Sequence, residues 1–260
     1  MLTIKEQTLL TEKFRVTFKQ NAAHQIDASD CIDAQKMVHH LTFIQQQIEA
    51  PNLQVAASIF SKRYSFVVLS ALYMFSVQDK KLNLSLQNVS LYTTNLDDSL
   101  WLPSIHYNNY EFDHVTGSNR EKLREKLITE LFAYHLEPIW LAIRHITKIS
   151  KLTLWENIVV YIFWMYEMLL QDTSIERNHP AIKADLHYLL HEAKGSQFGS
   201  YHHNPLQRYH TPKQHVKHVQ EPVRLRQTCC LSYQTAAKHQ YCKTCPVLCK
   251  TGQKGGNACG

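Results

Sequence analysis

The architecture is set by residues 53–78, which read LQVAASIFSKRYSFVVLSALYMFSVQ. Apolar residues occur on every side of the helix that this stretch would form, and its only charged residues are Lys62 and Arg63. Such a run predicts a long helix buried in the core. A second apolar run, IVVYIFWMYEMLL at residues 158–170, is too short to span a bilayer and contains Glu167, so it predicts another buried helix.

Shorter helical signals lie on either side of these two runs. Residues 30–50 have helical periodicity and end before a proline. Two capping-box patterns, in which a hydroxyl and a carboxylate three residues apart satisfy each other's free amides, predict helix starts at Ser118 and Thr153. A further helix is predicted between Pro180 and Gly195. The chain is therefore expected to be mainly helical.

The period of the apolar residues changes at residue 82. Leu82, Leu84 and Leu86 alternate with polar residues, and a turn-forming segment follows before the next apolar residues. This pattern predicts a small antiparallel β-sheet near residues 82–106, followed by a loop at 107–117. The expected fold class is α+β, mainly helical, with a cysteine-rich segment at the C-terminal end.

Glycine is scarce in the helical part of the chain. Of seven glycines, Gly117 is the only one before residue 195. Dinucleotide and nucleoside-triphosphate sites need glycine where the backbone approaches phosphate closely. A nicotinamide, flavin or ATP site of this kind is therefore not expected in residues 1–194. No secretory signal is recognised, so we expect a cytosolic setting in which cysteines serve as ligands rather than disulfides.

Six of the seven cysteines lie between Arg224 and Cys259. Four of them form two short-spaced pairs, Cys229-Cys230 and Cys242-Lys-Thr-Cys245, separated by eleven residues. This is the spacing of a metal or cluster site, because soft, anionic sulfur suits zinc or the iron of a cluster better than oxygen does.

Spacing alone leaves two kinds of site open. A structural zinc site is the commonest use of four clustered cysteines. Adjacent cysteines, however, are awkward ligands for one ion, because successive side chains diverge, and a two-iron cluster accommodates them more easily. A disulfide between them is disfavoured by the expected compartment and by the strain of vicinal bridges.

The stretch TCCLSYQTAAKHQYCKTCP resembles the C-terminal motif of the FhuF-like ferric-siderophore reductases. That family ends in Cys-Cys, about ten residues, then Cys-x-x-Cys, commonly followed by proline. The stretches SKRYSFVVLSALYMFS, LNLSLQNVSLY and LEPIWLAIRHITKISKLTLWENI are similar to the body of the same family. The resemblance extends over roughly residues 55–250, and the interval between the pairs is one residue longer here than is usual.

The resemblance implies a [2Fe-2S] cluster held by Cys229, Cys230, Cys242 and Cys245. Cys249 and Cys259 are close enough in the sequence to be alternatives. It also implies a cytoplasmic ferric-siderophore reductase that releases iron by one-electron reduction of the Fe(III) chelate. The electrons would come from a separate donor, such as a ferredoxin or a flavin- or nicotinamide-dependent reductase. Docking to a membrane permease would suit this chemistry.

The chain carries a net charge of +6, which favours an anionic partner. Many ferric siderophores are anionic, so Arg224, Arg226, Lys62 and Arg63 are candidate substrate-binding residues. Two other functions stay open: a zinc-binding interaction module, and a relative of siderophore synthetases without redox activity. Nucleic acid is not expected as a partner, because the basic residues lack interleaved aromatic residues for base stacking.

These observations divide the chain into three expected parts. Residues 1–195 form a mainly helical body with a small sheet. Residues 196–228 form a basic, histidine-rich connector, and residues 229–260 form the cysteine-rich tail that binds the cluster.

Overall fold

The computed structural model describes residues 2–216, 219–237 and 241–248. The α-helices are α1 (Ile4–Phe14), α2 (Ala34–Gln47), α3 (Leu53–Gln78), α4 (Arg120–Thr129), α5 (Glu137–Thr147), α6 (Lys151–Gln171) and α7 (His179–His187). Two π-helical segments, Glu130–Leu136 and Tyr188–Glu192, continue α4 and α7. The strands are β1 (His24–Asp27), β2 (Lys80–Leu82), β3 (Val89–Thr93), β4 (Ser104–Tyr107), β5 (Phe112–His114), β6 (Gln214–Val216) and β7 (Val219–Val223).

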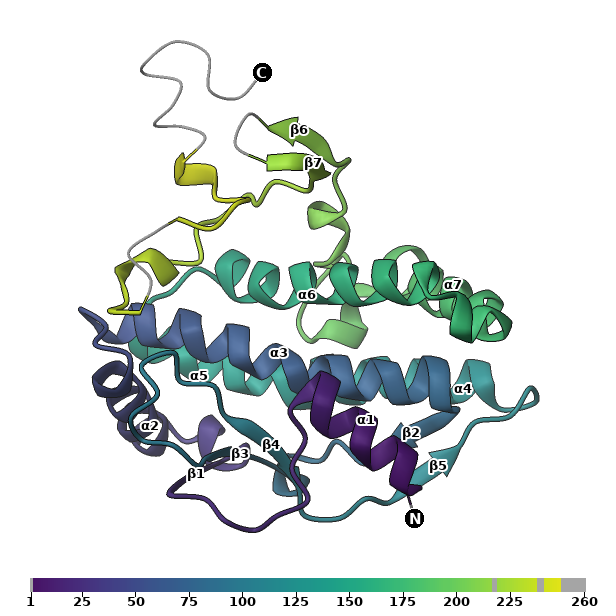
Figure 1. Cartoon of the computed structure of the whole chain (residues 1–260), viewed down its shortest axis with the longest axis horizontal. Helices are drawn as coiled ribbons and strands as arrows, with labels where there is room; N and C mark the ends of the chain where they lie inside the picture. The colour runs from purple at the N-terminus through teal and green to yellow at the C-terminus, as the bar shows by residue number, and fades with distance from the viewer. Residues whose placement is uncertain (1, 217–218, 238–240, 249–260) are drawn as a thin grey trace.

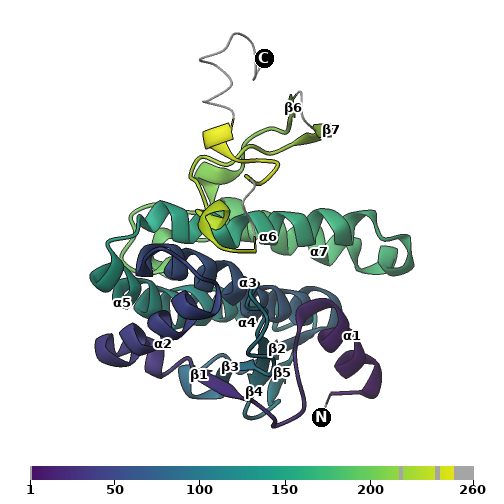
Figure 2. The ribbon, with the colours of Figure 1, turned by 60° about the vertical axis from the view of Figure 1, so that its left-hand side comes forward.

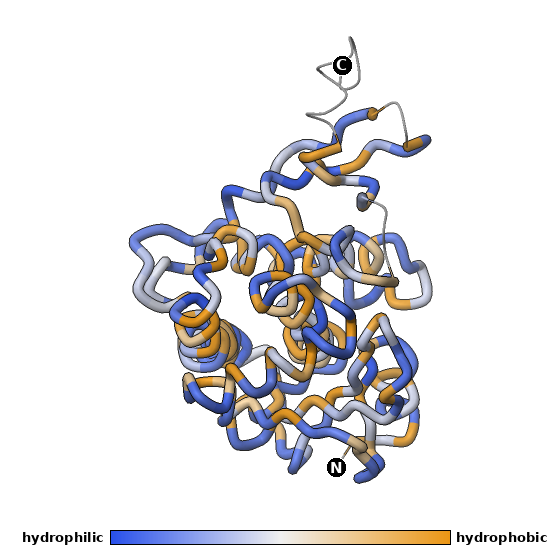
Figure 3. Tube along the Cα trace, turned by 90° about the vertical axis from the view of Figure 1, so that its left-hand side faces the viewer, coloured by the Kyte–Doolittle hydropathy of each residue, from blue (hydrophilic) through white to orange (hydrophobic). Residues whose placement is uncertain are grey.

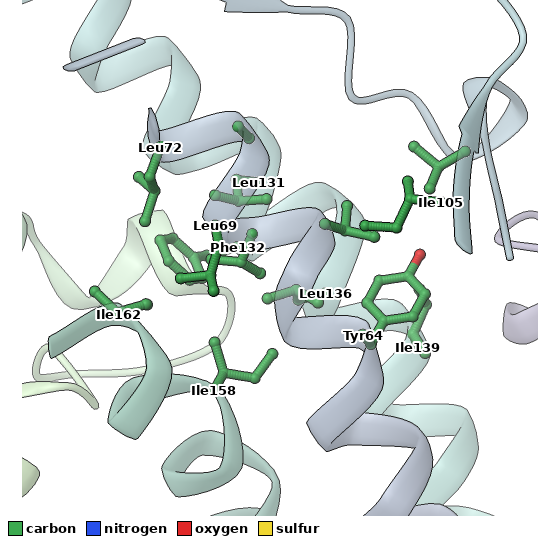
Figure 4. Packing of buried hydrophobic residues seen from close by; sticks show 14 of the residues in the cluster. Tyr64, Leu69, Leu72, Ile105, Leu131, Phe132, Leu136, Ile139, Ile158 and Ile162 are labelled. Carbon is green, nitrogen blue, oxygen red and sulfur yellow. The ribbon is translucent and has the colours of Figure 1, made fainter. Parts of the chain in front are cut away.

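The long apolar helix predicted at 53–78 is α3, and it lies at the centre of the protein (Figure 1). The Asn52 side chain accepts a hydrogen bond from the Val55 amide, and Asp79 ends the helix in a left-handed conformation. Helix α6 packs along one side of α3, and Figure 4 shows Leu69 of α3 close to Ile158 and Phe132. Both apolar runs thus form core helices, as the sequence predicts.

Helix α3 is long and apolar enough to cross a membrane by composition, but most of it is buried inside the protein. Figure 3 shows mostly hydrophobic residues along the helices that are seen end-on and hydrophilic residues along the outer loops. The length of α3 is therefore explained by its place in the core.

The antiparallel sheet predicted near residues 82–106 is present and extends further than predicted. Strand β3 lies in the middle of a three-stranded sheet, between β4 and β1, the second of which comes from far upstream. Strand β5 pairs with β2, although 107–117 was expected to be a loop. Strands β6 and β7 form a hairpin in the segment expected to be a connector.

The two predicted capping boxes are wrong. Helix α4 begins after Asn119, and no side chain caps its free amides. Helix α6 begins one turn earlier than predicted, after Ser150, whose hydroxyl accepts a hydrogen bond from the Leu152 amide at 3.2 Å. Thr153 therefore lies inside the helix, and the carboxylate of Glu156 is free to bind another part of the chain.

Candidate metal centre

The cysteine-bearing segment crosses the N-terminal ends of α3 and α6 (Figures 1 and 2). Among its contacts with the helical body, the Ser58 hydroxyl donates to the Cys230 carbonyl at 2.7 Å, and the Ala236 amide donates to the Ile48 carbonyl at 3.2 Å. Within the segment, the Arg226 amide donates to the Thr244 carbonyl at 3.0 Å. This last bond brings the beginning of the segment close to the second cysteine pair.

A fully buried amide, Asn157 of α6, connects the segment to both core helices. Its Nδ2 donates to the Ser58 carbonyl, the Ser58 hydroxyl and the Ser61 hydroxyl at 2.8–3.1 Å. Its Oδ1 accepts a hydrogen bond from Arg226 Nη2 at 2.6 Å. The polar face of α3 at this point consists of serines, which are small enough to let α6 approach.

The buried carboxylate of Glu156 holds the two residues that precede the cysteines. It accepts hydrogen bonds from the amides of Gln227 and Thr228, both at 2.7 Å, and from the Thr228 hydroxyl. Arg226 Nε lies 3.9 Å from the same carboxylate. A buried charge is costly unless it is paired and hydrogen-bonded, so these contacts specify one position for the segment on α6.

The four predicted ligands come together in two cross-pairs. The Cys242 thiol lies close enough to lower the pKa of Cys230, and the Cys245 thiol lies close enough to raise the pKa of Cys229. Cys230 and Cys245 are buried, whereas Cys229 and Cys242 are partly exposed. Each pair therefore takes one cysteine from the Cys-Cys motif and one from the Cys-x-x-Cys motif. Cys249 and Cys259 lie outside the described residues.

Polar groups other than cysteine also point at the sulfur atoms. The Leu231 amide donates to Cys229 Sγ at 3.4 Å, and Ser232 Oγ lies 3.1 Å from Cys230 Sγ. Lys62 Nζ lies 3.6 Å from Cys230 Sγ. The nearby Cys242 thiol and the positive charges of Lys62 and Arg226 lower the pKa of Cys230. Burial raises the pKa of Cys229 to about 11. A thiolate is favoured at Cys230 before any metal binds.

The four predicted substrate-binding cations differ in their surroundings. Arg226 is buried against Asn157 and Glu156. Arg224 pairs with Glu167 at 3.0 Å and lies over the ring of Phe163.

Lys62 and Arg63 form no ion pair with any residue that the structure describes. Arg63 donates to the carbonyls of Leu100 and Trp101 at 2.8 and 3.0 Å. The structure therefore brings Lys62 and Arg226 to the cysteines, while Arg224 lies beside the β6–β7 hairpin and Arg63 holds the loop before β4.

Glu156, Asn157, Ser58 and Ser61 were not predicted from the sequence to be part of the site. The signal that could have indicated them is the occurrence of a carboxylate, an amide and several hydroxyls within two otherwise apolar helices. Such groups are buried only if partners exist, but the sequence does not say that the partners come from residues 226–230.

The geometry of the cysteines fits a two-iron cluster. Four sulfur donors in two neighbouring pairs match a [2Fe-2S] cluster, in which each iron takes two protein ligands.

Comparison with known families also indicates a [2Fe-2S] cluster. Residues 58–217, more than half of the chain, match the family described as ferric iron reductase FhuF-like transporter. The chain belongs to this FhuF-like family. Residues 226–246 match the FhuF 2Fe-2S C-terminal domain, and this range contains four of the seven cysteines. No curated protein matches the chain. The FhuF-like chain is therefore a member of a ferric iron reductase family that carries a [2Fe-2S] cluster in its C-terminal segment.

Proposed function

We propose that this protein releases iron from a ferric siderophore by one-electron reduction of the chelated Fe(III). The observation that carries the proposal is the pair of cysteine cross-pairs, held against buried Glu156 and Asn157, within the range that matches a 2Fe-2S domain. A [2Fe-2S] cluster supplies electrons singly, which suits the Fe(III) to Fe(II) step.

The cluster ligands in this proposal are Cys229, Cys230, Cys242 and Cys245. All four lie in the matched range, and their thiols lie close enough to shift one another's pKa in two pairs. Ser58 holds the backbone at Cys230 and Asn157 holds the side chain of Arg226, which fixes the first cysteine pair on the helical body.

Reduction weakens the chelate because siderophores bind iron through hard, anionic oxygen atoms. Fe(II) has less charge than Fe(III) and is softer, so these ligands hold it less tightly. The protein needs no general acid, general base or nucleophile for this step. Its residues hold the chelate near the sulfur atoms, and the charge and burial around Cys230 set how readily the electron leaves.

Electrons reach the protein from a separate donor in this proposal. The first 194 residues have a single glycine and no phosphate-binding loop, which supports an external ferredoxin or a flavin- or nicotinamide-dependent reductase. We propose that the protein is located in the cytoplasm and docks to a membrane permease. We expect NADPH alone to leave the cluster oxidised.

The substrate carries negative charge in this proposal, and cations near the cysteines attract it. Lys62 lies 3.6 Å from Cys230 Sγ and has no carboxylate partner among the described residues. Arg63 lies next to it on α3. Arg224 and Arg226 already pair with carboxylates, so we propose that they mainly contribute to the field around the site.

Anaerobic purification followed by iron and sulfide analysis tests the cofactor and its ligands together. The dithionite-reduced protein is then mixed with a panel of ferric chelates, and Fe(II) is trapped with a ferrous-specific dye. We expect Fe(II) to appear as the cluster is reoxidised. Cys230→Ser should remove the visible spectrum and the activity, whereas Cys31→Ser, a buried cysteine far upstream, should keep both. Rapid reduction by NADPH without another protein would contradict the proposed donor.

A further inference from the structure

Side chains on one face of α3 form a row that leads away from the cysteines. Lys62 lies 3.6 Å from Cys230 Sγ, and Phe66 follows it four residues later on the same side of the helix. One turn of an α-helix rises by about 5.4 Å, so Phe66 lies a short step beyond the cluster ligands. Both side chains are partly exposed.

Two further helices contribute to the same place. The guanidinium of Arg15, the residue that ends α1, lies over the ring of Phe66 at 5.1 Å. The ring of Tyr161, from α6, lies 5.9 Å from that of Phe66. Arg15 is held at this position because its carbonyl accepts a hydrogen bond from the Ile105 amide at 2.8 Å. We call the four residues Arg15, Lys62, Phe66 and Tyr161 the cationic strip.

The positive charge in this place is not neutralised. Among the residues described, neither Arg15 nor Lys62 forms an ion pair, and no side-chain hydrogen bond from Arg15 to a protein acceptor is present. Arg63 adds a third charge nearby. Burial lowers the pKa of Arg63, the charge of Arg15 lowers it further, and Asp98 and Tyr161 oppose this shift. Because Arg15 and Lys62 have no carboxylate partner among the described residues, their charge attracts an anion to this surface.

We propose that the cationic strip binds the ferric substrate as an anionic, carboxylate-bearing chelate. The carboxylates lie against Arg15 and Lys62, the apolar part of the ligand lies on the rings of Phe66 and Tyr161, and the iron is held next to the sulfur atom of Cys230. This inference rests on the proposed function and names the place and the substrate class.

The size of the strip favours a small ligand over a protein. Stable protein interfaces bury about 800 Å² on each partner and involve about 20–30 residues a side. The strip consists of four partly exposed side chains from three helices. This number is far below the number of residues in such an interface and suits contact with a chelate. The alternative occupant, an acidic electron-donor protein, is an outcome of the test below.

The reaction at this site balances as a transfer of one electron. Dithionite, the reductant in the assay, reduces the protein beforehand. Fe(III) in the bound chelate gains one electron and becomes Fe(II), the protein loses one electron, and the ligand leaves with its charge unchanged. No covalent bond to the protein forms or breaks.

The test compares Arg15→Met with Arg177→Met, which removes the same charge from an exposed arginine in the 3₁₀ segment before α7. The dithionite-reduced proteins are mixed with anionic ferric EDTA or with uncharged ferric tris(acetohydroxamate), and reoxidation is followed by absorbance. We expect Arg15→Met to lower the second-order rate with ferric EDTA about tenfold, which corresponds to about 1.4 kcal/mol. The rate with the uncharged chelate and the reduction potential should stay the same, and Arg177→Met should behave as the unmodified protein.

A second variant and a binding experiment keep the inference testable if Arg15→Met alters the fold. Phe66→Leu keeps an apolar side chain but removes the ring, so it should weaken binding of the chelate while leaving the visible spectrum intact. Titration calorimetry with gallium(III) EDTA, which cannot be reduced, measures binding to the intact cluster-loaded protein without any electron transfer. Binding that is lost in Arg15→Met supports the strip even if no ferric chelate is reduced.

Three results would overturn the inference. Equal losses with the anionic and the uncharged chelates would show that charge recognition is not the role of Arg15. Unchanged binding of gallium(III) EDTA in both variants would place the substrate elsewhere. Slower reduction by an acidic ferredoxin, with no change in reoxidation by ferric EDTA, would assign the strip to the electron donor.

Discussion

Replacing Lys62 with methionine should lower the reduction potential of the cluster. The Lys62 ammonium lies 3.6 Å from Cys230 Sγ, the ligand proposed to bind one iron. Reduction adds negative charge to the cluster, and a nearby cation stabilises the reduced form more than the oxidised form. Methionine keeps most of the length of the side chain and removes its charge.

The magnitude follows from distance and exposure. Two unit charges about 4 Å apart interact by about 4 kcal/mol at an effective dielectric constant of about 20. Lys62 is partly exposed, and fully exposed pairs are worth about 0–1 kcal/mol, so an intermediate value applies. About 1.4 kcal/mol is a tenfold change in the equilibrium constant, or about 59 mV for one electron. We therefore expect the potential to fall by about 59 mV.

A spectroelectrochemical titration of the purified protein, without any chelate, measures this potential directly. Lys62→Arg keeps the charge and should retain most of the potential. Lys183→Met removes an exposed charge from α7 and controls for the change in net charge. An unchanged potential in Lys62→Met, with the cluster fully occupied, would refute the assigned electrostatic role.

Three further predictions concern the scaffold that holds the site. Glu156→Gln should cost about 2–3 kcal/mol, because the charged acceptor of two amides and a hydroxyl is lost, and thermal unfolding together with a fall in iron content measures it. Gly199→Ala should lower the unfolding temperature, because Gly199 has a φ of 113° and an added Cβ would lie 2.6 Å from Glu137 Cγ; an unchanged midpoint would contradict the strain. Burial lowers the pKa of His135 from 6.5 to about 4, so the unfolded chain takes up the proton first and stability falls as the pH drops from about 6.5 towards 4, by about 3 kcal/mol in total. Unfolding midpoints at pH 7 and pH 5 should therefore differ less in His135→Gln, and an equal difference in both proteins would count against this assignment.

Much of the helical framework could be predicted because its signal is local. The runs at 53–78 and 158–170 are apolar for the length of a core helix, and both form one. The sheet region was found through the alternation at 82–86, although only Leu82 of this stretch lies in a strand, β2, and β3 begins at Val89. Its partner β1 was missed, because pairing between residues more than 60 positions apart leaves no pattern in either strand.

The site was predicted as a set of ligands and not as a structure. The spacing of Cys229, Cys230, Cys242 and Cys245 indicated a metal centre, because thiolates recur at short intervals where a chain wraps around metal. The same local reasoning assigned Glu156 to a capping box with Thr153. In the structure its carboxylate accepts hydrogen bonds from the amides of Gln227 and Thr228, because a buried charge needs donors and these come from the end of the connector.

The sequence by itself determined which residues can bind soft metal and which helices must be buried, because donor chemistry and hydrophobic periodicity are properties of short segments. Only the tertiary structure decided how Cys229–Cys230 meets Cys242–Cys245 in cross-pairs and which cation approaches the sulfur. Lys62 and Cys230 are separated by 168 residues. Their contact exists because Asn157 and Glu156 hold residues 226–228, directly before the tail, against α6. The packing of α6 on α3 is in turn set by the whole core.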